Sequence, residues 1–158
     1  MGQTERMMRG KSVFSIVISP LTGEMLEFAQ TGAPERTALI SIMNHKRDCA
    51  ERYPAPRVLR LCFDDAVDTS FWQNLMTQEQ ADAICAFVLR HGREIDDLIV
   101  HCSAGVSRSP AVAAGILAGL RQDDSAIWKN PGYQPNPYVY RLVREAFARG
   151  VRWKTRTE

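Results

Sequence analysis

The segment 98–120 limits the possible folds of this chain more than any other. It begins with a short apolar run, continues through Cys102 and five further residues that are mostly small, and ends in a helical pattern. Such an order predicts a buried strand, a tight loop and a helix over Ser109–Leu120. Pro110 fits this helix because proline is tolerated in the first helical turn. The segment therefore predicts a strand whose end faces a helix N-terminus across a short loop.

Strand and helix patterns also alternate along the rest of the chain. Short apolar runs predict strands over Val13–Ile18, Ala38–Met43 and Val58–Phe63. Helical patterns occupy Leu21–Gln30, the residues between Thr77 and Gly92, and a last segment from Asn136. The last segment carries an apolar stripe, which consists of Val139, Leu142, Val143, Ala146 and Phe147. This alternation is typical of an α/β domain. We predict a single compact domain, 1–158, with a central, mostly parallel sheet flanked by helices and a core over about 12–150.

Two of the predicted helices carry more detailed signals. Thr77 with Gln80 has the spacing of a capping box, and an apolar face follows at Ala81, Ile84, Cys85 and Val88. The helix Ser109–Leu120 is rich in small side chains, namely Ala113, Ala114, Gly115, Ala118 and Gly119. We therefore expect that helix to lie close against the sheet.

Composition excludes several classes of protein. Hydrophobic residues make up 45% of the chain and charged residues 24%, with a formal net charge of +2, which predicts neither a nucleic-acid partner nor a membrane partner. The four cysteines show no Cys-x-x-Cys spacing, so we expect reduced thiols and a cytoplasmic location. The first residues lack the apolar core of a signal peptide, and Arg6 replaces the Ser or Thr of a myristoylation signal. No metal site or cofactor is predicted.

Cys102 and Arg108 are the candidate reactive residues. A thiolate needs surroundings that favour negative charge, and loop amides, a helix N-terminus and a guanidinium all supply them. Arg108 offers a planar fork for two phosphate oxygens. We expect the backbone amides of the loop to bind the remaining oxygens, with Gly105 allowing the loop to curl. The predicted phosphate-binding residues are Ser103, Ala104, Gly105, Val106, Ser107 and Arg108.

The order His-Cys, five residues, Arg-Ser resembles the active-site loop of the cysteine-dependent protein tyrosine phosphatases. The interior Ala-Gly-Val-Ser-Arg-Ser looks most like the dual-specificity branch and small bacterial relatives, and the resemblance covers roughly residues 38–147. It implies a phosphatase in which Cys102 is the nucleophile. His101 would orient the loop and help to keep the thiol ionised. Ser109 would donate its hydroxyl to the sulfur, cap the following helix, or do both.

The same chemistry requires a group that protonates the leaving oxygen and later activates water. The dual-specificity family keeps its acid in a loop at the position of Asp64-Asp65-Ala66-Val67-Asp68. Matching strand to strand favours Asp65 as the acid, with Asp64 second and Asp68 third. The chain has Phe63-Asp64-Asp65 in place of a Trp-Pro-Asp loop and is too short for the large tyrosine-specific domain, which indicates a compact enzyme with a shallow cleft.

The expected substrate is phosphotyrosine in a protein or peptide, with phosphoserine and phosphothreonine as a second class. Lipid and RNA phosphates stay open, although the phosphate loop contains no lysine of the kind often found in phosphoinositide phosphatases. Two other functions are alternatives: a phosphatase-like module that binds phosphopeptides without turnover, and a sulfur-transfer protein. Four aromatic residues are candidates for either the cleft wall or the core, namely Phe71, Trp72, Tyr133 and Tyr138. The basic C-terminal end predicts a solvated helix face.

Overall fold

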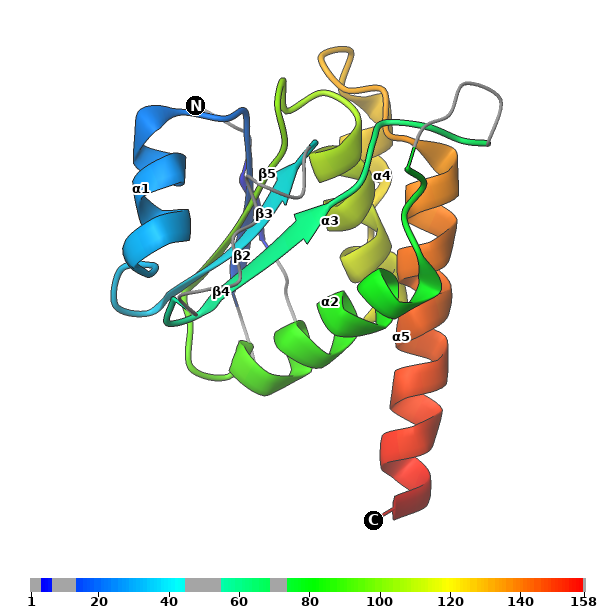
Figure 1. The fold of residues 1–158 in the computed structure, drawn as a ribbon. Helices are drawn as coiled ribbons and strands as arrows, with labels where there is room; N and C mark the ends of the chain where they lie inside the picture. The colour runs from blue at the N-terminus through cyan, green and yellow to red at the C-terminus, as the bar shows by residue number, and fades with distance from the viewer. Residues whose placement is uncertain (1–3, 7–13, 45–54, 69–73, 158) are drawn as a thin grey trace.

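A computed structural model describes residues 4–6, 14–44, 55–68 and 74–157, with side chains described from residue 14 to residue 150 within these ranges (Figure 1). In chain order the elements are β1 (Thr4–Arg6), β2 (Ser15–Ser19), α1 (Gly23–Thr31), β3 (Thr37–Met43), β4 (Val58–Cys62), α2 (Gln78–His91), β5 (Asp97–His101), α3 (Arg108–Gly119), α4 (Ser125–Lys129) and α5 (Pro137–Thr157).

The five strands form one sheet in the order β1-β2-β5-β3-β4. β2, β5, β3 and β4 run parallel, whereas β1 pairs antiparallel with β2 at the edge. Helix α1 covers one face of this sheet, and α2, α3 and α5 lie on the other (Figure 1). The predicted α/β fold with a mostly parallel sheet is confirmed.

Side chains of β3 show how the sheet separates two apolar clusters. Ala38, Ile40 and Ile42 belong to the large core that includes α2, α3 and α5, whereas Leu39 packs with Met25 of α1 on the opposite face. Successive strand residues point to opposite faces, so one apolar run supplies both clusters. The continuous apolar pattern of this strand follows from burial on both sides.

The predicted strands and helices are confirmed to within a few residues. Thr77 and Gln80 form the predicted capping box at the start of α2, and the predicted face of that helix is buried. The sequence patterns did not predict β1 or α4, which have three and five residues. Elements this short contain too few positions to show a periodicity. Most of the predicted loop at 44–56 lies outside the described residues.

Helix α3 contacts β2 and β5, as its small side chains led us to expect, and its glycines in addition lie against α5. A Cβ atom on Gly115 would lie 2.7 Å from the Cβ of Val143, and one on Gly119 would lie 2.4 Å from the Cβ of Phe147. Both contacts are too short for real side chains. The small residues of α3 therefore set the distance between two helices.

The expectation of reduced thiols is wrong for Cys62, which is disulfide-bonded. Cys85 and Cys102 are free and buried. Spacing along the chain does not report which thiols the fold brings together, so the disulfide gave no signal in the sequence. Among the described residues, no helix is both long enough and apolar enough to cross a membrane.

Candidate active site

Three strands end at the same edge of the sheet, and each is followed by a polar or reactive side chain. Cys102 follows β5, Asp64 and Asp65 follow β4 within three residues, and Asn44 follows β3. Ligands of parallel sheets bind beyond the carboxyl ends of the strands. This edge is the candidate active site.

Cys102 lies at the base of the loop 102–108 with its sulfur surrounded by hydrogen-bond donors. The backbone N–H groups of Gly105 and Ser109 lie 3.3 Å and 3.4 Å from Sγ, and the hydroxyl of Ser109 lies 3.2 Å from it. Donors at these positions suit a sulfur that carries negative charge. The side chain is buried, with 2% of the residue exposed.

The loop is braced by the residues that follow β2. The backbone N–H of Leu21 donates to the carbonyl of Ser103 at 3.0 Å, and that of Cys102 donates to the carbonyl of Ser19 at 3.3 Å. Gly105 has φ +73°, and a Cβ there would lie 2.8 Å from the backbone nitrogen of Pro20. Only glycine fits both the backbone angle and this close approach.

Arg108 is buried and held by groups from two strand ends. Its Nη1 donates to Oδ1 of Asn44 at 2.5 Å and to the carbonyl of Phe63 at 2.8 Å. Its Nη2 donates to the hydroxyl of Ser103 at 3.1 Å. These contacts fix the plane of the guanidinium next to the loop, where a planar group can bind two oxygens of a phosphate.

His101 is fully buried in the middle of the sheet, and its ring joins the loop to β3. Nε2 lies 2.6 Å from the hydroxyl of Ser41, and Nδ1 lies 3.4 Å from the carbonyl of Cys102. A carbonyl only accepts, so Nδ1 carries the hydrogen and the Ser41 hydroxyl donates to Nε2. Burial lowers the pKa of His101, against a smaller opposing effect of the Cys102 carbonyl. The arrangement fits a neutral, orienting histidine.

Asp65 is the carboxylate that contacts the loop 102–108. Its Oδ1 accepts from the hydroxyl of Ser107 at 2.8 Å and from Nδ2 of Asn136 at 2.9 Å. Asp64 instead closes its own loop, because Oδ2 accepts from the backbone N–H of Asn74 at 2.7 Å. A cavity of about 450 Å³ lies beside this contact and includes Asp65, Asp68 and Ser107 in its lining. The geometry supports the predicted order of Asp65 before Asp64.

Ser109 does not cap α3, which corrects one of its two expected roles. The helix begins at Arg108, so Ser109 lies inside the first turn, and the capping position belongs to Ser107. The Ser107 hydroxyl makes no capping bond and donates to Asp65 instead. The Ser109 hydroxyl faces Cys102, as the other expected role requires.

The described aromatic candidates serve packing. Tyr133 and Tyr138 pack against the large core, and the hydroxyl of Tyr138 donates to the carbonyl of Met76 at 2.9 Å. Phe71 and Trp72 lie outside the described residues.

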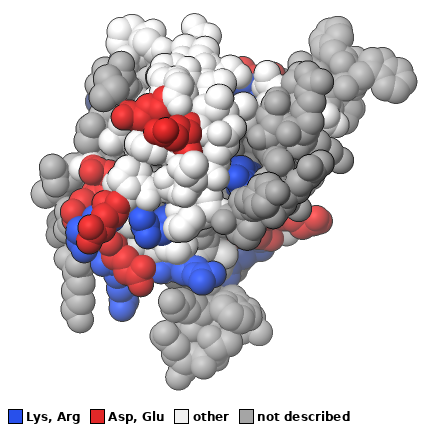
Figure 2. Space-filling model, turned by 60° about the vertical axis from the view of Figure 1, so that its left-hand side comes forward, with Lys and Arg blue, Asp and Glu red and all other residues white. Residues whose placement is uncertain are grey.

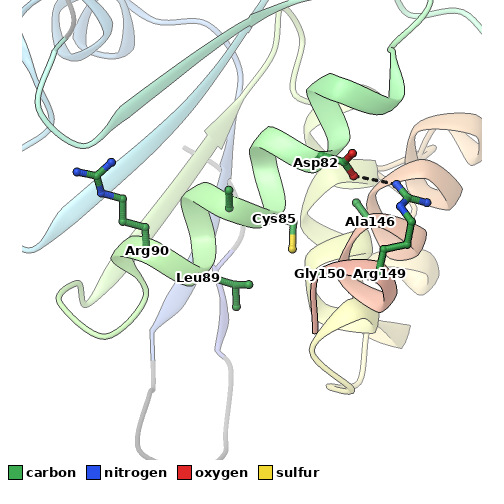
Figure 3. Close-up of a pocket in the computed structure, with 8 residues that line it drawn as sticks. Asp82, Cys85, Leu89, Arg90, Ala146, Arg149 and Gly150 are labelled. Carbon is green, nitrogen blue, oxygen red and sulfur yellow. Dashed lines mark hydrogen bonds and ion pairs between the residues drawn. The ribbon is translucent and has the colours of Figure 1, made fainter. Parts of the chain in front are cut away.

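A second cavity, of about 570 Å³, lies between α2 and α5 (Figure 3). Cys85 contributes to its wall, and burial, followed by the charge of Asp82, raises the pKa of this thiol to about 11. A thiol of this kind is protonated at neutral pH and is a poor nucleophile. The cavity therefore lacks the chemistry found around Cys102.

The described basic residues of α5 are engaged with partners. Arg149 pairs with Asp82 at 2.8 Å, Arg141 lies 3.5 Å from Glu145, and Arg144 stacks over Tyr140. The face turned forward in Figure 2 carries described side chains of both signs rather than a continuous basic surface. Within the described residues, no group of three or more histidine, cysteine or carboxylate side chains is arranged to hold a metal ion.

Three residues of the site were missed by sequence reasoning: Ser41, Asn44 and the side chain of Asn136. The first two had an available signal, because residues at the carboxyl ends of parallel strands meet at one edge. Asn136 was predicted only as the start of a helix. Its contact with Asp65 joins positions 71 residues apart, and no local pattern predicts such a contact.

No family model matches the sequence, and no curated protein sequence matches it. Several solved structures are similar to this chain in fold. PTPMT1 in complex with PI(5)P is 16% identical, with a TM-score of 0.55 over 88% of this chain and 94% of that one. DUSP15 is 12% identical, with a TM-score of 0.56 over 97% and 94% of the two chains. The human tyrosine phosphatase-like serine/threonine/tyrosine-interacting protein is 18% identical, with a TM-score of 0.51 over 86% and 93%.

These similarities establish the fold. The chain has the architecture of the cysteine-dependent phosphatases of the dual-specificity type, as the resemblance of its segment 101–109 led us to expect. The aligned segments span most of the chain and most of each solved structure.

Proposed function

We propose that this chain is a phosphomonoester hydrolase that acts through a cysteinyl-phosphate intermediate. One observation carries the proposal: the Cys102 sulfur faces the donors of Gly105 and Ser109 in a loop that also holds the Arg108 guanidinium and touches Asp65. A nucleophile, an anion-binding loop and a carboxylate are the parts that phosphoryl transfer to sulfur requires.

The reaction has two steps. In the first, the Cys102 thiolate attacks phosphorus, the ester P–O bond breaks, and Asp65 gives its proton to the leaving oxygen. Arg108 and the loop amides bind the phosphoryl oxygens throughout. In the second step, Asp65 accepts a proton from water, the water oxygen bonds to phosphorus, and the S–P bond breaks. The Ser109 hydroxyl stabilises the departing thiolate.

The proposed substrate is phosphotyrosine in a protein or peptide, with phosphoserine and phosphothreonine second, and no cofactor is needed. Loop residues 103–107 carry no cation, and Asp65 and Asp68 line the neighbouring cavity, which disfavours a polyanionic substrate. The lipid alternative has one observation in its favour, since the similar PTPMT1 structure holds PI(5)P. The proposed location is the cytoplasm, on the strength of the free thiols of Cys85 and Cys102, although the disulfide of Cys62 counts against it.

A non-hydrolytic binding module is the main alternative, because a tyrosine phosphatase-like interacting protein shares the fold. Phosphate release from p-nitrophenyl phosphate in EDTA separates the two functions. We expect turnover by the wild type and none by Cys102→Ser. A wild type that is as inactive as Cys102→Ser would refute the hydrolase proposal. Thiosulfate:cyanide transfer by the wild type would favour a sulfur-transfer protein instead.

Substrate class requires a separate measurement. A panel of phosphotyrosine, phosphoserine and phosphothreonine peptides together with phosphoinositide vesicles should give the highest kcat/KM on the phosphotyrosine peptides. Preference for the vesicles would establish the lipid alternative.

A further inference from the structure

Asn136 is a buried polar residue that the proposed mechanism does not use. It precedes α5, only 3% of it is exposed, and its side-chain amide makes four hydrogen bonds. A buried amide with every donor and acceptor engaged holds its neighbours in one arrangement.

The four bonds divide between the two ends of the amide. Oδ1 accepts from the backbone N–H groups of Tyr138 and Val139, at 3.0 Å and 3.1 Å, which caps α5. Nδ2 donates to Oδ1 of Asp65 at 2.9 Å and to the carbonyl of Ala66 at 3.1 Å. Two donors face one end and two acceptors face the other, so only one orientation of the amide satisfies them all.

The backbone at Asn136 is tied to the phosphate loop as well. Its N–H donates to the carbonyl of Ser107 at 3.1 Å, and the N–H of Gln134 donates to the carbonyl of Val106 at 2.8 Å. The Ser107 hydroxyl donates to the same Asp65 oxygen that Asn136 contacts. Asn136 thus connects the start of α5, the phosphate loop and the carboxylate.

We infer that Asn136 is a positioning residue that holds the Asp65 carboxylate against the phosphate loop in the orientation needed for proton transfer. This inference rests on the proposed function, in which Asp65 is the general acid. With Oδ1 engaged by Asn136 and Ser107, Oδ2 is the oxygen left to carry the proton to the leaving group. General acids depend strongly on such placement.

The test separates capping from positioning. Asn136→Ser keeps an oxygen that caps the helix but removes the amide that donates to Asp65. Loss of general-acid function is greatest for poor leaving groups, so kcat/KM is measured on phenyl phosphate and on p-nitrophenyl phosphate. We expect a loss of about tenfold or more on phenyl phosphate, and a clearly smaller loss on p-nitrophenyl phosphate.

Two controls complete the design. Thr77→Ala removes the side-chain cap of α2, and we expect it to lower the melting temperature without discriminating between the two substrates. In an Asp65→Asn background, Asn136→Ser should cause no further selective loss, because the group that it positions is gone.

Each outcome is decisive. Equal losses on both substrates, or no loss on either, would reduce Asn136 to a helix cap and overturn the inference. If Asp65→Asn alone shows no leaving-group-dependent loss, Asp65 is not the general acid, and the proposed function fails at that residue together with the inference.

Discussion

Asp64 and Asp65 are neighbours in the chain with different surroundings. Asp64 binds the backbone of Asn74 through both its side chain and its own backbone, whereas Asp65 binds Ser107 of the phosphate loop. Chemical type and sequence position are nearly the same for the two residues. Contact with the loop is what distinguishes them as candidates for proton transfer.

We predict that Asp65→Asn lowers kcat by about 10²- to 10⁴-fold on a phosphotyrosine peptide, because an amide cannot protonate the leaving oxygen. Asp64→Asn should cost far less, since its amide oxygen can still accept from Asn74. Steady-state kinetics of both variants on the same peptide provide the measurement. Equal, small effects would mean that another residue supplies the proton.

At the scale of the elements, helix packing depends on two glycines. Gly115 and Gly119 of α3 face Val143 and Phe147 of α5 with no room for a Cβ atom. Helix α3 begins at Arg108, and α5 begins directly after Asn136, so the distance between these helices affects both halves of the site.

Gly119→Ala should therefore lower the free energy of unfolding by about 1–3 kcal/mol, because the added methyl group overlaps Phe147. For a chain of this size each kcal/mol lowers the melting temperature by about 2–4 °C. Gly23→Ala is the matched control, since a Cβ there meets nothing within 4 Å. An unchanged melting temperature for Gly119→Ala would show that α5 moves aside without cost.

Elements with a clear periodicity were predictable from the sequence. The strand before Cys102, the capping box of Thr77 and the apolar stripe of α5 each agree with the structure. Contacts between elements were not predictable. The glycines of α3 contact residues of α5 that lie far along the chain, and a single sequence carries no signal for such pairs. The spacing of the cysteines likewise gave no signal for the disulfide of Cys62.

The candidate site also has parts that the sequence predicts and parts that it does not. Cys102 and Arg108 lie in one loop, so their spacing was enough to bring them together. The choice of Asp65 depended on a family resemblance, and the geometry supports that choice. Ser41 and Asn44 could have been placed at the same edge of the sheet from the sequence, but the partner of each depends on the register of the parallel strands.

At the scale of the whole molecule, the sheet encloses an ionisable group next to Cys102, the proposed nucleophile. His101 is fully buried between β2 and β3, with a lowered pKa caused first by burial. The folded chain resists protonation of this ring, whereas the unfolded chain takes up a proton near pH 6.5. His101 therefore contributes stability that is complete above that pH and is lost as the pH falls below it.

We predict that wild-type stability decreases between pH 7.5 and pH 5.5 more steeply than that of His101→Gln, by up to about 1.4 kcal/mol per pH unit. Urea denaturation at several pH values measures the two slopes. His91, whose pKa is also lowered by burial, is present in both proteins and cancels in the comparison. Parallel slopes would show that His101 accepts a proton without cost to the fold.

The two bonds between Asp64 and Asn74 have a consequence for how such a protein can diversify. The backbone N–H of Asp64 donates to the carbonyl of Asn74 at 2.7 Å, and the Asp64 carboxylate accepts from the N–H of Asn74 at the same distance. These two bonds hold together the two ends of the connection between β4 and α2. Residues inserted, deleted or exchanged between the two ends would leave both of these bonds in place. The part of this connection beyond Ala66 can therefore change in sequence or length, in evolution or by engineering, while Asp65 keeps its contact with the loop 102–108.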